Sequence, residues 1–223
     1  MGVHDGHRDR KKDQFLRCGA DSFADHELLE LLLFYGIPQR DTNPIAHELV
    51  DHFGGLRGVF SAAPEDLMEV DYIKKNAAVL LRLVTAIYQR ILISDDEKAM
   101  IFQDSAQIGE FFRTIYVGQP VEVMYQLCLD VKGKKRGIFK VSEGDLGSVG
   151  LNIRQIVENA LHCKAMVVVL AHNHPSGLAL PSRDDRIATR MVREALDAVG
   201  IRLADHVIVA DNDYVSMAES GLL

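Results

Sequence analysis

The sequence has few cysteines, no excess of basic residues and no long apolar run. Its three cysteines, at positions 18, 128 and 163, contain no Cys-x-x-Cys pair, which excludes a disulfide framework and fits a reducing cytosol. Acidic residues outnumber basic ones by 32 to 25, and the net charge is −7. This excludes the class of proteins that bind nucleic acid through an overall positive charge. The apolar runs at 28–34 and 166–171 are far shorter than the ~20 residues of a membrane span. With no secretion signal at the charged N terminus, we expect a soluble, cytoplasmic protein with no membrane partner.

The residues that are present predict two domains with different architectures. A length of 223 residues, 48% of them hydrophobic, is enough for one large domain or two small ones with real cores. Residues 1–94 show helical periodicity, residues 95–101 form an acidic linker, and residues 102–223 alternate between helical and strand patterns. Helices are predicted at 26–35, 43–53, 64–70, 76–93, 108–115, 153–163 and 183–199, and strands at 121–131, 137–141, 165–171, 201–210 and 214–217. The chain is therefore expected to belong to the α/β class, with a small all-α domain at its N terminus.

The most informative segment follows the apolar run that ends at residue 171. His172 and His174 stand two apart at the end of a predicted strand, so both imidazoles project to the same face. Ser182 and Asp185 lie at the start of the next predicted helix. Two histidines and one carboxylate are the ligand set of a catalytic zinc, which keeps its fourth position open for water. Ser182-x-x-Asp185 is equally typical of a helix capping box, and a histidine at a strand end is often only a surface residue.

Several segments of the sequence together resemble a known family. The spacing His-x-His-Pro, six residues, Ser, two residues, Asp resembles the JAMM motif of MPN+ metalloproteases without a departure. Short segments in and around this motif narrow the resemblance to the RadC family. They are Ser142-Glu143-Gly144, Ala171-His172-Asn173-His174-Pro175-Ser176-Gly177, Pro181-Ser182 and Asp205-His206. The resemblance is strong over residues 102–223 and looser over residues 6–90. It implies a C-terminal MPN/JAMM domain of the cytidine-deaminase-like α-β-α type.

The resemblance also implies a catalytic site. By it, His172, His174 and Asp185 bind one zinc ion per chain, and Glu143 holds the water and moves its proton. Ser182 would offer its hydroxyl to the developing oxyanion, although a plain N-cap role for this serine has equal support. The implied activity is zinc-dependent hydrolysis of a peptide or isopeptide bond in a protein or peptide substrate. A cytidine deaminase is excluded because the chain has neither His-x-Glu nor Pro-Cys-x-x-Cys.

The N-terminal half resembles helix-hairpin-helix DNA-binding modules but departs from their pattern. Where the hairpin of such modules carries glycines, this chain has Tyr72 and Lys74. Lys74 and Lys75 offer point charges to a phosphate, but Asp71 opposes them, and 11 basic against 14 acidic residues give this half a net charge of −3. Nucleic acid is therefore a weakly supported partner. The alternative function is a non-enzymatic DNA repair or recombination accessory, and the sequence indicates neither the substrate nor the oligomeric state.

Three histidines and one aspartate outside this set have more ordinary interpretations. His206 is open between orienting a metal ligand and simply packing in the core. Asp145, close to Glu143, is expected to be a turn residue. His4 and His7 are expected to lie on a mobile, solvated terminus.

Overall fold

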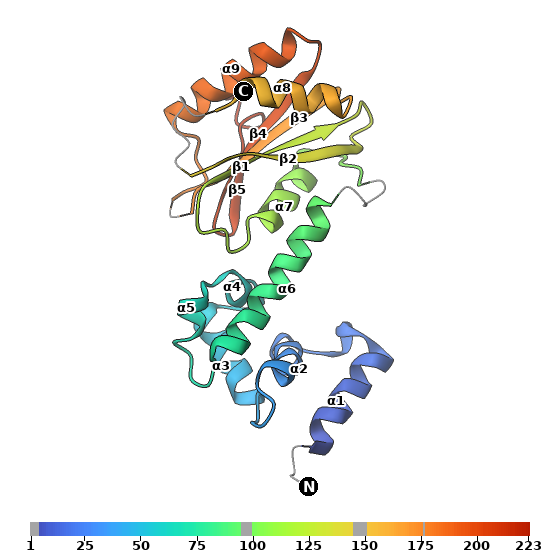
Figure 1. Cartoon of the computed structure of the whole chain (residues 1–223), viewed down its shortest axis with the longest axis vertical. Helices are drawn as coiled ribbons and strands as arrows, with labels where there is room; N and C mark the ends of the chain where they lie inside the picture. Colours follow the sequence, from blue (N-terminus) through green and yellow to red (C-terminus); the bar gives the residue numbers. More distant parts are fainter. Residues whose placement is uncertain (1–4, 95–99, 145–150, 176) are drawn as a thin grey trace. The chain divides into compact units, whose positions relative to one another are not determined.

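The computed structural model describes residues 5–94, 100–144, 151–175 and 177–223 (Figure 1). Contacts within the chain divide it into two units, Met1–Tyr88 and Gln89–Leu223. The division falls inside a helix rather than after residue 94, where the sequence pattern changes. Of the linker predicted at 95–101, residues 95–99 lie outside the described residues. Each unit has its own apolar core.

The first unit is helical, as its periodicity predicts. Helices α2, α3, α5 and α6 correspond to the four predicted helices, whereas α1 and α4 have no counterpart among the predictions. Helix α1 is too charged to show an apolar stripe, and α4 has only six residues. The N-cap of α3 is Thr42. The elements are α1 (Asp5–Cys18), a 3-10 turn (Ala20–Ser22), α2 (Asp25–Gly36), α3 (Asn43–Phe53), α4 (Leu56–Ser61), α5 (Pro64–Leu67) and α6 (Lys75–Ile93).

A buried carboxylate joins α1 to α2. The side chain of Glu30 is fully buried and accepts hydrogen bonds from His7 Nε2 at 2.7 Å and Asn43 Nδ2 at 2.9 Å, with Lys11 Nζ at 3.1 Å. Burial alone would raise the pKa of Glu30, but the bonds from these three partners outweigh it and hold the pKa below its ordinary value. His7 is therefore a packed partner, so the solvated terminus expected for it is wrong; His4 lies outside the described residues.

Removing this carboxylate is expected to destabilise the first unit. Glu30→Ala should lower its free energy of unfolding by about 3 kcal/mol, because a buried ion pair loses one partner. The loss should shrink below pH ~4, since a lowered pKa stabilises the folded state only where the unfolded carboxylate is also ionised. Urea unfolding followed by far-UV circular dichroism measures it. The matched control is Lys140→Ala, which breaks a pair whose two side chains are each 51% exposed and should change stability by less than about 0.5 kcal/mol. Equal effects of the two variants would contradict this role for Glu30.

The loop between α5 and α6 keeps a glycine-type backbone without glycine. Tyr72 has a φ of 67°, in the left-handed region that costs a residue with a Cβ atom about 1–2 kcal/mol. The Arg40 guanidinium lies 3.7 Å from the centroid of the Tyr72 ring, and such a cation–π contact offsets about 0.5–1 kcal/mol at an exposed site. At Tyr72 the backbone therefore has a conformation that favours glycine, although the residue there is a tyrosine. Binding of nucleic acid here stays a prediction.

Helix α6 is the only described helix that is long and apolar enough to cross a membrane, by length and composition. Its Ala77, Ala78 and Leu81 belong to the apolar core of the first unit. A core helix passes the same length and composition test, so one such helix is weak support for a membrane span.

The second unit is a mixed five-stranded sheet with helices on both faces, which confirms the α/β class. The strand order is β2-β1-β3-β4-β5; β3 and β4 are parallel and every other pair is antiparallel. Helix α7 covers one face, and α8 and α9 cover the other (Figure 1). The elements are α7 (Ser105–Ile115), β1 (Val123–Leu129), β2 (Lys135–Glu143), α8 (Ile153–His162), β3 (Val167–Asn173), α9 (Arg183–Asp197), β4 (Arg202–Ala210) and β5 (Asp213–Ser216).

Alternation along β3 assigns each residue to one of the two faces. Val169 and Ala171 pack in the core cluster of α7, whereas Val168 and Leu170 pack in the cluster of α8 and α9. Because side chains alternate along a strand, His172 continues the second set and lies on the face of α8 and α9. The fold thus brings the end of β3 to the same side of the sheet as the start of α9.

Candidate metal centre

The two motif histidines lie at the carboxyl end of the central strand β3. The side chain of His172 is fully buried and that of His174 is 21% exposed. Their Nε2 atoms are 2.9 Å apart. The Nδ1 atom of His174 lies 3.0 Å from the carbonyl oxygen of Leu178, which only accepts, so Nδ1 is the donor and the neutral ring has its lone pair on Nε2. The structure thus brings both imidazoles to one point.

Asp185 reaches the same point from the first turn of α9. Ser182 is the N-cap of this helix: its Oγ accepts from Asp185 N at 3.1 Å, and its N and Oγ donate to Asp185 Oδ2 at 2.7 and 2.6 Å. Oδ1 lies 3.3 Å from His172 Nε2, and Oδ2 lies 3.8 Å from His174 Nε2. Burial alone would raise the pKa of Asp185, but the contact with His172 and the bonds from Ser182 hold it well below its ordinary value. An ionised carboxylate thus faces the two histidines.

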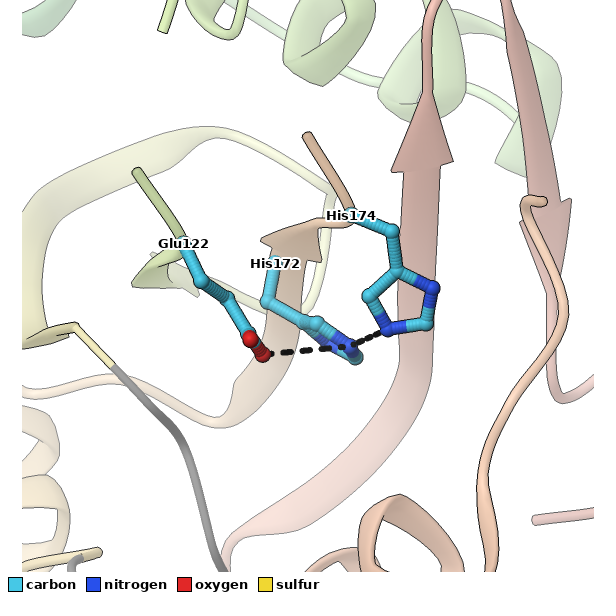
Figure 2. A group of neighbouring side chains, drawn as sticks. All are labelled: Glu122, His172 and His174. Carbon is cyan, nitrogen blue, oxygen red and sulfur yellow. Dashed lines mark hydrogen bonds and ion pairs between the residues drawn. The ribbon is translucent and has the colours of Figure 1, made fainter. Parts of the chain in front are cut away.

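Glu122 is the fourth side chain at this point, and the sequence analysis missed it. Its Oε1 lies 3.9 Å from His172 Nε2, and Figure 2 shows its carboxylate pointing toward the two imidazoles. One ligand atom from each of Glu122, His172 and His174 lies within 4.8 Å of the other two, which is compatible with a metal ion. Asp185 approaches His172 more closely, and its side chain is 7% exposed against 24% for Glu122. Asp185 is thus nearer to His172 and more buried than Glu122, and its role as the third ligand stays a prediction.

The structure does not bring Glu143 to the histidines, so the placement expected for it is wrong. Glu143 pairs with Val123 across β1 and β2, and Val123 packs in the cluster of α7. Directly paired residues share a face of the sheet, so Glu143 lies on the side opposite His172. Its carboxylate is half-exposed and forms an ion pair with Lys140 at 2.5 Å. The nearby Asp145 lies outside the described residues, as does Ser176 of the motif.

Strand pairing explains why Glu122 occupies this place. Met124 is paired with His172, and Glu122 stands two residues before Met124, so it reaches the same face at the level of His174. The side chain of Asn173 binds the backbone on both sides of Glu122. Its Oδ1 accepts from Val123 N at 2.8 Å, and its Nδ2 donates to the Val121 carbonyl at 3.0 Å. The available signal was an acidic residue directly before a mainly apolar strand. The register of β1 against β3, which brings Glu122 to the histidines, cannot be predicted from the sequence.

His206 packs directly behind His172. It is fully buried on β4, and its Nε2 atom lies 2.8 Å from His172 Nδ1. Burial is the main cause that lowers the pKa of His206 well below its ordinary value, and the neighbouring His172 and His174 lower it further. The structure shows both burial in the core and contact with a predicted ligand, so the role of His206 in orienting that ligand stays a prediction.

The donor set fits a divalent ion of the zinc type. Two imidazole nitrogens and a carboxylate oxygen are the common protein ligands of a catalytic zinc site. In this cluster the lone pair of His174 Nε2 and the oxygens of Asp185 are acceptors that face one another within 4 Å, an arrangement that a cation stabilises. The geometry supports a metal ion without identifying it.

Comparisons with known proteins agree with this architecture. The family model RadC-like JAB domain matches residues 102–222, and the family model UPF0758 N-terminal matches residues 6–79. A UPF0758 protein of Variovorax paradoxus (strain S110) is 34% identical over 96% of both chains. A UPF0758 protein of Fusobacterium nucleatum is 32% identical over 98% of this chain and 97% of the relative. A third, from Bordetella petrii, is 35% identical over 96% of both. The chain therefore belongs to the RadC family, with a UPF0758 N-terminal region followed by a RadC-like JAB domain.

Proposed function

We propose that the protein is a zinc-dependent hydrolase that cleaves a peptide or isopeptide bond in a protein substrate. The observation that carries the proposal is the convergence of His172, His174 and Asp185, with Glu122 beside them, at one edge of the JAB domain. Domains of this family are usually hydrolytic, which supports the same activity. One zinc ion per chain is the proposed cofactor.

Each residue has a role that follows from its position. When bound, zinc supplies a Lewis acid that polarises a carbonyl group and lowers the pKa of a water molecule to about 7. Glu122, beside the ligands and 24% exposed, accepts a proton from the attacking water and returns it to the departing amine. Ser182 holds the carboxylate of Asp185 through two hydrogen bonds. The oxyanion role expected for Ser182 stays a prediction, and it requires the hydroxyl to leave Asp185 Oδ2.

The test is a search for amines released from cellular proteins. Existing amines are blocked by dimethylation, the full-length zinc-loaded protein is added, and newly exposed α- and ε-amines are labelled and identified. Peptide cleavage exposes an α-amine and isopeptide cleavage a lysine ε-amine, so the label also identifies the bond class. We expect new amines with the zinc-loaded protein and none with His174→Ala. An identical set with both proteins would contradict the proposal and favour the alternative, a non-enzymatic repair accessory or interaction module.

A further inference from the structure

Four groups behind the candidate metal centre form a continuous chain of hydrogen bonds. The hydroxyl of Thr189 lies 2.5 Å from the carbonyl oxygen of Asp185 and 2.6 Å from His206 Nδ1. His206 Nε2 lies 2.8 Å from His172 Nδ1. Thr189, His206 and His172 are all at most 2% exposed. The chain starts on the backbone of one predicted ligand, Asp185, and ends on the ring of another, His172.

Regular secondary structure accounts for each link. Thr189 stands four residues after Asp185 in α9, where a threonine hydroxyl reaches the carbonyl one turn back. His206 is paired with Leu170 across the parallel strands β3 and β4, so its ring shares the face of His172, two residues further along β3. Helix α9 and strands β3 and β4 thus hold these hydrogen-bonded groups in place independently of any ion.

The backbone carbonyl of Asp185 fixes the proton positions along this whole series of hydrogen bonds. A carbonyl oxygen only accepts, so the single hydroxyl proton of Thr189 is used on Asp185. Thr189 must then accept a proton from His206 Nδ1. When its single ring proton is at Nδ1, His206 has its lone pair on Nε2, so His172 must donate from Nδ1. The remaining nitrogen of His172, Nε2, then carries the lone pair whenever the His172 ring is neutral, and it faces the site.

We propose that Thr189 and His206 are positioning residues that lock His172 in the tautomer whose Nε2 lone pair is available to the metal. The proposal rests on the ligand set of the proposed function. The backbone carbonyl of Leu178 does the same for His174 directly, at 3.0 Å. His172 is too deeply buried for water to select its tautomer, so it depends on this relay.

Two substitutions at position 189 separate the relay from simple packing. Thr189→Val keeps the shape of the side chain but can neither donate to Asp185 nor accept from His206, whereas Thr189→Ser restores both bonds. The control is Met217→Leu, because Met217 is buried and its sulfur lies 3.7 Å from the same hydroxyl, but it is no part of the relay. All variants are made in the full chain, and their folding is checked by circular dichroism.

The first measurement is the affinity for zinc alone, by competition with a chelator. Loss of a group that orients a metal ligand typically costs 10- to 100-fold in affinity, so Thr189→Val should bind zinc ~10- to 100-fold more weakly. Thr189→Ser and Met217→Leu should bind it as the wild type does. Equal affinity in wild type and Thr189→Val would overturn the proposal.

The second measurement is the tautomer of His172 in the metal-free chain, by long-range ¹H–¹⁵N correlation. The wild type should be protonated at Nδ1. In Thr189→Val, His206 has no acceptor at Nδ1, so its proton should move to Nε2 and that of His172 to its own Nε2. Protonation of wild-type His172 at Nε2 would overturn the proposal. This readout involves neither zinc nor turnover, so the relay can fail while amines are still released, and it can hold when they are not.

Discussion

Glu122→Gln is expected to reduce the rate of amine release by about 100- to 10,000-fold, the usual contribution of a general acid–base group. Glutamine keeps the size and hydrogen-bonding reach of the side chain but takes up no proton. Because Glu122 lies beside the ligands and outside their set, zinc content and far-UV circular dichroism should not change. The measurement is the initial rate on any substrate that the amine-labelling search identifies.

The matched control for Glu122→Gln is Glu143→Gln. Both substitutions remove one carboxylate at the same end of the β1–β2 pair, where Glu122 directly precedes β1, but Glu143 lies on the opposite face of the sheet and pairs with Lys140. Glu143→Gln should therefore leave the rate unchanged. Full activity in Glu122→Gln together with its loss in Glu143→Gln would reverse the assignment and restore the role first expected for Glu143.

His172→Ala and His174→Ala are each expected to reduce zinc from one ion per chain to a small fraction of it. Each removes one of only three protein ligands, and the remaining two do not form the set that holds a catalytic zinc. Elemental analysis of protein prepared without a histidine-rich tag, after dialysis against metal-free buffer, measures the content. The control is His162→Ala, an exposed histidine at the end of α8, which should keep its zinc. Equal zinc in wild type and His174→Ala would contradict the ligand assignment.

The elements that the sequence predicts well are those with strong apolar periodicity and clear ends. The predicted helix at 183–199 corresponds to α9, Arg183–Asp197, because Ser182 supplies its cap and apolar residues recur along one face. Helix α1 shows no such stripe, since its charged side chains contact α2, among them His7 and Lys11, which meet Glu30 far along the chain. Charged helices that dock through buried ion pairs give no periodic signal to read.

In the candidate site, too, the sequence predicts what local spacing determines and misses what depends on strand pairing. His172, His174 and Asp185 are separated by short, regular spacings, so a strand end and a helix start bring them together without further information. Glu122 joins them only through the pairing of β1 with β3, which no local pattern encodes. The family resemblance of the surrounding segment implies Glu143, but the register of β2 places this residue on the other face of the sheet.

Anomalous X-ray scattering at the zinc edge, from crystals of the zinc-loaded full chain, tests the central claim most directly. The account predicts one peak per chain, about 2.0–2.2 Å from His172 Nε2, His174 Nε2 and one Asp185 oxygen, with the Glu122 carboxylate beside it but outside that distance. A peak coordinated by Glu122 in place of Asp185, or no peak at these histidines, would contradict it.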